Sequence, residues 1–223
     1  MFSKSSIFQS NIFVVCLFAL AFNPALSADD LKVKISSKIS EVTVQHNGQP
    51  VTIKRIQDQK NTVVEDYALT SRACPPFCVQ PIEVAPGVTT IGELELLDFL
   101  QRKSDGDKSI VIIDSRTPDW VEKGTIPGAT NLPWTKLHPQ SDGYEPIEVE
   151  GILTLQFNAS VSEGIWNFSN AKTLVFFCNG PWCGQSPTNI KALVNLGYPA
   201  HKMFWYRGGM QAWQSLGLTT VKP

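Results

Sequence analysis

The second half of the chain contains three short apolar runs, and helical patterns lie between or after them. The runs cover residues 109–114, 174–177 and 202–206, and each is almost continuous. Runs of this kind are typical of strands buried on both faces. Helices are predicted over 187–195 and 210–216, because each pattern is followed by a glycine. Strands that alternate with helices predict an α/β fold with a parallel sheet flanked by helices.

A further helix is predicted to begin near residue 90. Thr90 and Glu93 have the spacing of a capping box, in which each residue satisfies a backbone N–H group at the start of a helix. Apolar residues then recur on one helical face, at Ile91, Leu94, Leu97 and Leu100.

The N-terminal part of the chain has a different pattern. Polar and apolar residues alternate over 41–45 and 51–55, on either side of Asn47-Gly48. This predicts a small β-hairpin, which is too small to carry its own core and is expected to pack against the larger domain or a partner. A proline-rich joint over 74–81 follows. We therefore expect an appendage over 28–87 and a main domain over 88–223.

The first 27 residues are predicted to be a secretory signal peptide. Lys4 precedes an apolar stretch over 12–22, and the small residues Ala25 and Ser27 suit cleavage after position 27. The expected location is therefore periplasmic or secreted, without stable membrane insertion after cleavage. The apolar stretch is short for a membrane span, although an uncleaved anchor stays open as an alternative.

The charge balance gives no sign of a polyanionic partner. The chain has 19 basic and 20 acidic residues, a net charge of −1, and loss of Lys4 with the signal would make it −2. Nucleic-acid binding and membrane-surface binding both need a basic patch that this balance does not indicate. We expect no nucleic-acid partner.

Four of the five cysteines form two close pairs, Cys74/Cys78 and Cys178/Cys183, and the fifth lies in the predicted signal. In an oxidising compartment each pair can be a permanent disulfide, a redox-active one or two free thiols. A metal site at Cys74/Cys78 is not expected, because none of the three histidines has ligand-like spacing to these cysteines.

Cys178 ends an apolar run, and a short loop rich in glycine and proline follows it. Ser186 and Pro187 are predicted as the N-cap and first residue of the next helix. Backbone N–H groups and the helix N-terminus would then lower the pKa of the Cys178 thiol. In a parallel sheet, ligands bind beyond the carboxyl ends of the strands, where Asp114, Cys178 and Arg207 are all expected.

These residues together resemble the rhodanese family of sulfurtransferases. The similar motifs are, in chain order, Asp114-Ser115-Arg116, the Gly-Thr-Ile-Pro-Gly-Ala segment 124–129, Cys178, and the Arg-Gly-Gly-Met-Gln-Ala-Trp segment 207–213. Thr125 stands where the family usually has a histidine. The Cys-Pro-Pro-Phe-Cys segment at 74–78 lies outside the common domain and looks like a subgroup of exported bacterial rhodanese-like proteins.

The resemblance implies that Cys178 is a nucleophile that carries sulfane sulfur as a persulfide. From the residues themselves, Cys183 is predicted to be the resolving thiol and Arg207 the cation for the substrate, while Asp114 and Arg116 are predicted to support the site. The other loop residues would be Asn179, Gly180, Pro181, Trp182, Gly184, Gln185 and Ser186. The expected partners are a small sulfur-containing anion or persulfide as donor, and a thiol acceptor or reducing protein. No organic cofactor is implied.

The loop departs from the family pattern. It is about two residues longer than the common sulfurtransferase loop and has no basic residue, so phosphatase chemistry, which needs an arginine to hold phosphate, is not expected. Two alternatives stay open. One is a thiol–disulfide oxidoreductase that uses Cys178/Cys183, with Cys74/Cys78 as a relay. The other is an inactive rhodanese-type module that binds a protein through the Trp182 loop.

Overall fold

A five-stranded parallel sheet forms the centre of the computed structural model, which describes residues 31–223. The predicted signal peptide lies outside this range. The strands, in spatial order, are β3 (Thr89–Ile91), β9 (Met203–Tyr206), β8 (Thr173–Phe177), β4 (Ile110–Asp114) and β5 (Thr130–Asn131). All neighbouring pairs are parallel. The predicted α/β fold is confirmed.

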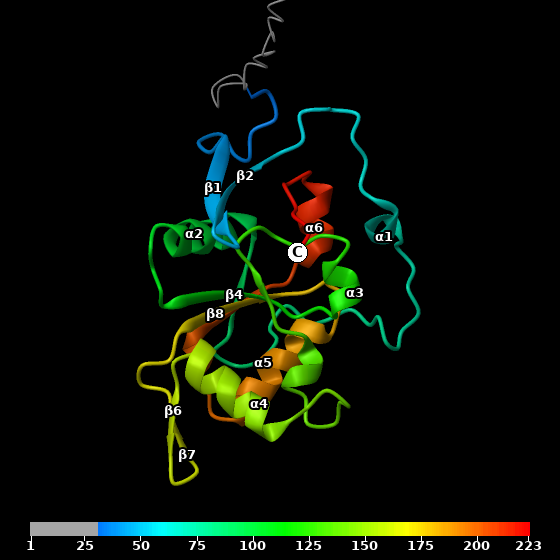
Figure 1. Cartoon of the computed structure of the whole chain (residues 1–223). Helices are drawn as coiled ribbons and strands as arrows, with labels where there is room; N and C mark the ends of the chain where they lie inside the picture. The colour runs from blue at the N-terminus through cyan, green and yellow to red at the C-terminus, as the bar shows by residue number, and fades with distance from the viewer. Residues whose placement is uncertain (1–30) are drawn as a thin grey trace, which may run out of the picture.

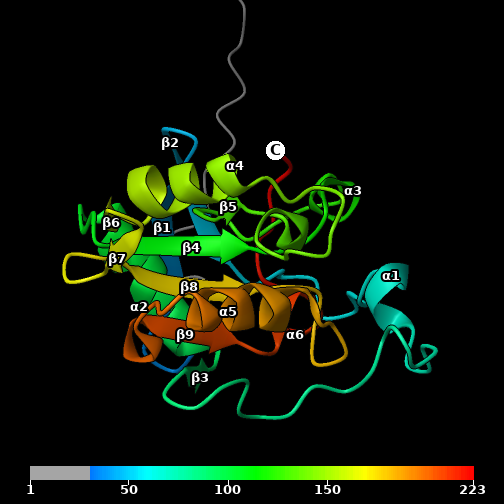
Figure 2. The same ribbon diagram turned by 90° about the horizontal axis from the view of Figure 1, so that it is seen from below.

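Helices cover both faces of the sheet (Figures 1 and 2). One face packs against α2 (Glu93–Ser104) and α6 (Gly209–Ser215). The other packs against α4 (Pro146–Gly151), its continuation η3 (Ile152–Gln156), and α5 (Gln185–Asn195). Within β8, Leu174 and Phe176 lie in one core while Val175 and Phe177 lie in the other. This two-sided burial explains why the apolar run is continuous.

The predicted N-terminal hairpin is also confirmed. β1 (Glu41–His46) pairs antiparallel with β2 (Gln49–Lys54) through a turn in which Asn47 and Gly48 have φ of 49° and 77°. The hairpin packs on α2, as Figure 1 shows, and buries Val42, Val44 and Ile53 in the same core as α2. The appendage is therefore packed against the main domain.

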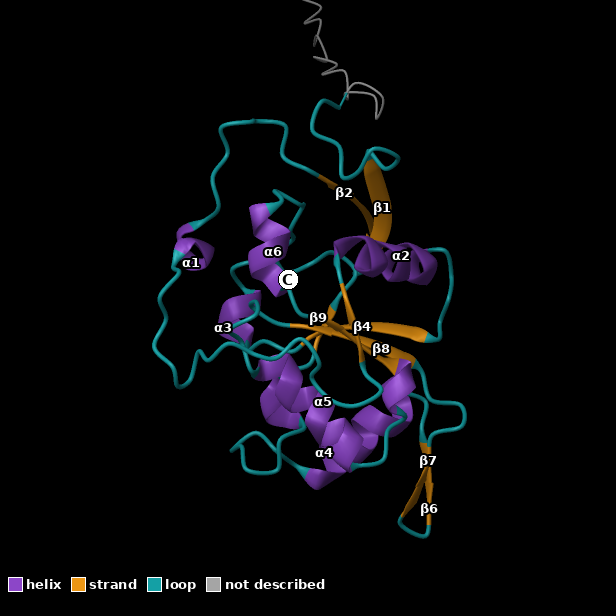
Figure 3. Ribbon diagram, turned by 180° about the vertical axis from the view of Figure 1, so that it is seen from behind, coloured by secondary structure: helices purple, strands orange, loops and turns teal. Residues whose placement is uncertain are grey.

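Several short elements complete the described part of the chain. They are α1 (Glu65–Ala68), α3 (Pro118–Val121), η2 (Trp134–Lys136), η4 (Ala200–Lys202) and the antiparallel hairpin of β6 (Ser160–Ser162) and β7 (Ile165–Asn167). The β6–β7 hairpin projects away from the sheet, as Figure 3 shows. Over residues 31–223 no helix has the length and apolar character needed to cross a membrane.

The predicted capping box at Thr90 and Glu93 is wrong. Thr90 lies in β3 opposite Trp205 of β9, so pairing with the sheet keeps this segment extended. The helix α2 begins at Glu93, with Gly92 as N-cap, and the carboxylate of Glu95 accepts a hydrogen bond from the Gly92 N–H at 3.0 Å. The capping interaction therefore exists two residues further along the chain.

The predicted N-cap at Ser186 is also wrong. Gly184 is the N-cap of α5, and its carbonyl accepts the Thr188 N–H at 2.9 Å. Ser186 lies in the first turn, where its hydroxyl is buried and directed toward Cys178. The hydroxyl is thus used in the site rather than in capping the helix.

Candidate functional site

Cys178 follows directly after β8 and its side chain is buried. The Ser186 hydroxyl donates a hydrogen bond to the Cys178 sulfur at 3.0 Å. The Trp205 indole N–H donates in turn to the Ser186 oxygen at 3.1 Å, so the hydroxyl proton is free to point at the sulfur. A strand end, a helix start and the neighbouring strand β9 together position this thiol.

The two cysteines of the loop are unbridged, buried and in contact. Burial alone would raise the pKa of Cys178. Hydrogen bonds from the Cys183 thiol, the Ser186 hydroxyl and the backbone N–H groups of Ser186 and Gly180 outweigh it and lower that pKa to about 7. Burial and the neighbouring Cys178 sulfur raise the pKa of Cys183 well above its ordinary value. Cys178 is therefore the first of the two thiols to lose its proton, and about half of it is thiolate near pH 7.

The loop backbone is held by the start of α6. The Cys178 carbonyl accepts the Met210 N–H at 2.9 Å, and the Asn179 carbonyl accepts the Gln211 N–H at 2.8 Å. Gly209 makes this approach possible, because its φ is +54° and a Cβ there would lie 2.3 Å from the Cys178 carbonyl oxygen. The glycine motif after β9 thus serves to bring α6 against the loop.

Asp114 and Arg116 form a buried ion pair beside the loop. The guanidinium donates to both carboxylate oxygens, at 2.9 Å from Nε to Oδ1 and 2.6 Å from Nη2 to Oδ2. The Thr125 hydroxyl donates to the same carboxylate at 2.7 Å, in the place where the family usually has a histidine. Arg116 also donates to the Gly124 carbonyl at 2.7 Å. These contacts tie β4 to the following loop, and the supporting role of the pair stays a prediction.

Tyr67 of α1 connects this ion pair to the cysteine loop, and sequence reasoning missed it. Arg116 Nη1 donates to the Tyr67 oxygen at 3.1 Å, and the Tyr67 hydroxyl donates to Asn179 Oδ1 at 3.2 Å. Burial raises the pKa of Tyr67 to about 12, so the hydroxyl stays protonated. A single tyrosine in a region of weak pattern carries no signal that would have identified it.

Replacing Tyr67 by phenylalanine should loosen the loop without unfolding the protein. The substitution removes both hydrogen bonds of the hydroxyl but keeps the ring, so we expect a loss of about 1–3 kcal/mol in the free energy of unfolding, because buried partners are left unpaired. Chemical denaturation measures this loss. A variant as stable as the wild type would show that the connection contributes nothing.

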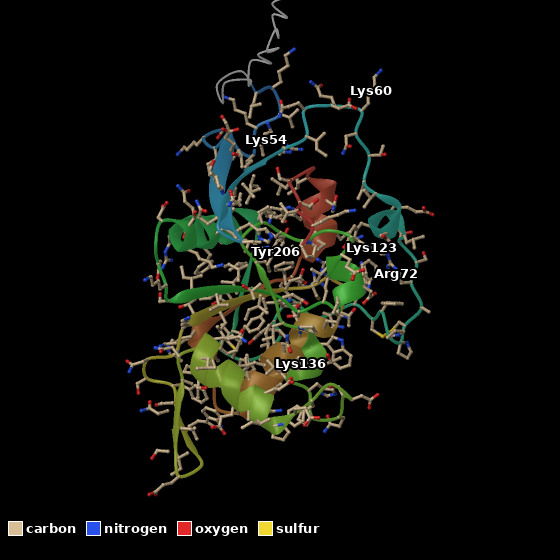
Figure 4. All side chains as sticks on the ribbon, viewed as in Figure 1. Lys54, Lys60, Arg72, Lys123, Lys136 and Tyr206 are labelled. Carbon is tan, nitrogen blue, oxygen red and sulfur yellow. A yellow bond between two sulfur atoms is a disulfide. The ribbon has the colours of Figure 1, made fainter. Side chains whose placement is uncertain are left out.

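The segment between α1 and β3 lies over the loop; residues 72–81 are called the cover below. A disulfide joins Cys74 and Cys78, so both of these thiols are engaged. The Phe77 ring packs edge-on against Trp182 with centroids 5.6 Å apart, and the Gln80 N–H donates to the Pro181 carbonyl at 2.7 Å. The Arg72 guanidinium lies 4.2 Å from the centroid of the Trp182 ring. Figure 4 shows Arg72 on this outlying segment.

Arg207 holds the cover and lies outside the cavity wall. Its guanidinium donates to the Gln80 carbonyl at 2.7 Å from Nη2 and to the Pro81 carbonyl at 3.2 Å from Nε. In the structure this arginine follows directly after β9, as expected. The Arg207 side chain donates to backbone carbonyl groups in the structure. Its contact with a substrate stays a prediction.

A cavity of about 230 Å³ opens between the loop, the cover and the segments after β4 and β5. Its walls consist of Pro76, Phe77, Trp120, Trp134, Asn179, Trp182, Cys183, Gly184, Gln185 and Thr188. Cys178 lies just behind this wall, with its sulfur 3.4 Å from the Cys183 carbonyl oxygen. Within residues 31–223, no group of three or more His, Cys, Asp or Glu side chains is arranged to hold a metal ion.

Known structures show similarity to part of the chain. A protein of unknown function described as a possible tyrosine phosphatase, from Rhodopseudomonas palustris, is 23% identical, with 62% of this chain and 88% of that one covered and a TM-score of 0.39. A human single-domain sulfurtransferase is 22% identical, with 56% and 95% covered and a TM-score of 0.36. An As–Sb reductase from Leishmania major is 22% identical, with 56% and 76% covered and a TM-score of 0.39.

A comparison with curated proteins found no match. A model of the rhodanese-like domain matches residues 96–216, which is more than half of the chain. The match includes Asp114, Arg116, both loop cysteines and Arg207, and it begins after the hairpin, Tyr67 and the cover. The chain therefore belongs to the rhodanese-like domain family.

Proposed function

We propose that this protein is an exported sulfurtransferase that carries sulfane sulfur as a persulfide on Cys178. The observation that carries the proposal is the environment of the Cys178 sulfur, an unbridged thiol that accepts a hydrogen bond from the Ser186 hydroxyl at 3.0 Å and whose pKa is lowered to about 7. The rhodanese-like domain supports the same chemistry. The predicted signal peptide supports a periplasmic or secreted location.

In the first half-reaction, the Cys178 thiolate attacks the sulfane sulfur of a donor. A new S–S bond forms on Cys178, and the bond from the sulfane sulfur to the rest of the donor breaks, so the leaving group departs with the electron pair. The Ser186 hydroxyl and the N–H groups of Gly180 and Ser186 lie at the Cys178 sulfur and stabilise the thiolate that attacks.

In the second half-reaction, the sulfur passes to an acceptor thiol or leaves as sulfide. For sulfide release, Cys183 loses its proton and attacks the Cys178 sulfur, so that hydrosulfide leaves and a Cys178–Cys183 disulfide forms. The contact between the two side chains supports this resolving role. An external dithiol, such as that of a reducing partner protein, would then reduce the bridge and itself be oxidised to a disulfide.

Thiol–disulfide exchange is a second candidate, because the contact between the two thiols also favours it. The same cysteines would then cycle between dithiol and disulfide with no sulfur atom transferred. The two functions can be distinguished by the persulfide, because only a sulfurtransferase gains a sulfur atom from its donor.

The pH dependence of loading tests the proposed nucleophile. Because the thiolate attacks and the pKa of Cys178 is lowered to about 7, the rate of persulfide formation should rise with pH and reach half of its maximum near pH 7. Quenched-flow loading followed by mass analysis gives this profile. A rate that rises only near about pH 8.5, the range of an ordinary cysteine, would contradict the assigned environment.

A further inference from the structure

We infer that the cavity beside the loop binds an apolar organic group on the sulfur donor. The preferred donor class is then an organic thiosulfonate or persulfide with one aromatic or branched group, in place of inorganic thiosulfate. The inference rests on the proposed function, because it specifies the substrate of the same site. It is carried by the composition, size and position of the cavity.

The cavity wall is aromatic and uncharged. Four aromatic side chains line it, from four separate parts of the chain: Phe77 in the cover, Trp120 in α3, Trp134 in η2 and Trp182 in the loop. The polar side chains of the wall are neutral, namely those of Asn179, Gln185 and Thr188, together with the Cys183 thiol. Aromatic walls contribute binding energy mainly by burial of apolar surface and by ring packing.

None of the three nearby arginines lines the cavity. Arg116 is fully buried in its pair with Asp114, and Arg207 donates to the carbonyl groups of Gln80 and Pro81. Arg72 lies on the Trp182 ring and donates to the Asp66 carbonyl. A dianion such as thiosulfate would therefore lose its hydration in the cavity without gaining a cation in the wall.

The size of the cavity fits one ring. An apolar cavity of about 150 Å³ is known to hold benzene. The cavity here has about 230 Å³, so it can hold a phenyl group with several further atoms. A methyl group would leave most of the aromatic wall without contacts, and this difference makes the prediction measurable.

The position of the cavity directs such a donor toward the nucleophile. Cys183 lines the wall, and the Cys178 sulfur lies directly behind it, 3.4 Å from the Cys183 carbonyl oxygen. A donor whose ring fills the cavity can therefore present its sulfane sulfur at the cysteine pair. Pro76 and Phe77 belong to the cover, outside the matched domain over 96–216, so the appendage itself helps to select the donor.

The reaction with a thiosulfonate balances without any further reagent. The Cys178 thiolate bonds to the terminal sulfur of R–SO₂–S⁻, and the S–S bond breaks. The organic sulfinate R–SO₂⁻ leaves with the electron pair, and Cys178 becomes a persulfide anion. Only the group R differs between benzenethiosulfonate and methanethiosulfonate, so these two donors form a matched pair.

The test compares single-turnover loading of the full protein by benzenethiosulfonate, methanethiosulfonate and thiosulfate. Burial of the phenyl ring should raise kcat/KM for the benzene donor at least about 10-fold over the methane donor. In Trp134→Ala this ratio should fall toward one. In the control variant Leu155→Ala, whose side chain is 84% exposed and outside the cavity, the ratio should stay as in the wild type.

A binding measurement separates this inference from the proposed function. Benzenethiosulfonate should quench the tryptophan fluorescence of Cys178→Ser and bind at least about 10-fold more tightly than methanethiosulfonate. Equal binding and equal loading by the two thiosulfonates, or fastest loading by thiosulfate, would overturn the inference and leave the sulfurtransferase intact. Binding of the benzene donor with no loading of the wild type would overturn the proposed function and retain the apolar site.

Discussion

Replacing Cys178 by serine is expected to lower sulfur transfer by at least about 10³-fold, because the nucleophile that forms the persulfide is lost. A hydroxyl group at this position keeps the size of the side chain and can still bond to the Ser186 oxygen, so the fold should be retained. Sulfide release or sulfur transfer to an added thiol measures the activity. Circular dichroism and thermal unfolding check the fold.

The variant Cys183→Ser is the matched control for this prediction. It removes the proposed resolving thiol but leaves the nucleophile, so it should still form the persulfide once. If Cys178→Ser transfers sulfur within about 10-fold of the wild type, another group must be the nucleophile and the assignment of Cys178 fails.

Among the variants considered, replacing Asp114 by alanine is expected to cause the largest loss in the free energy of unfolding. The carboxylate accepts from Arg116 and Thr125, and the Arg116 side chain has no exposed surface. Without its partner the guanidinium is an uncompensated buried charge, which costs about 3–5 kcal/mol. The loop should also loosen, because Arg116 positions Tyr67 and through it Asn179. Denaturant unfolding measures the change.

Asp98→Ala provides the control for this effect. Asp98 lies 3.8 Å from Arg102 on the surface of α2, and these side chains are 68% and 50% exposed. Loss of such an exposed pair should change the free energy of unfolding by no more than about 0.5 kcal/mol. A loss below about 1 kcal/mol for Asp114→Ala would show that the buried pair is not the anchor described here.

The sheet could be predicted from the sequence because strands that are buried on both faces consist of continuous apolar runs. Each residue of β8 lies in one of two cores, so its apolar run is unbroken. The hairpin was equally accessible, since Asn47 and Gly48 adopt the positive φ angles that its turn requires. Both features could be predicted because they depend on the residues of one short segment.

The helix starts were predicted less well, because tertiary contacts decide them. Thr90 pairs with β9 and therefore lies in a strand. The Ser186 hydroxyl bonds to Cys178, so it does not cap the helix. Neither partner is near in sequence. Local capping patterns therefore indicated that a helix was close but placed its first residue wrongly.

The candidate site was also only partly accessible. Asp114, Cys178 and Arg207 were expected at one edge of the sheet, because they follow parallel strands, and they are found after or at the ends of β4, β8 and β9. Tyr67 and the aromatic cavity could not be predicted, because they depend on how the segment before β3 folds back over the loop. That path is set by contacts such as Arg207 with Gln80.

The intact mass of Cys183→Ser after incubation with a sulfane donor tests the central claim most directly. Without the resolving thiol the persulfide should accumulate, so the account predicts a gain of one sulfur atom that maps to Cys178 and is lost on mild reduction. An unchanged mass with every donor tried, while Cys178 stays reduced and the protein stays folded, would contradict a sulfur carrier at this thiol.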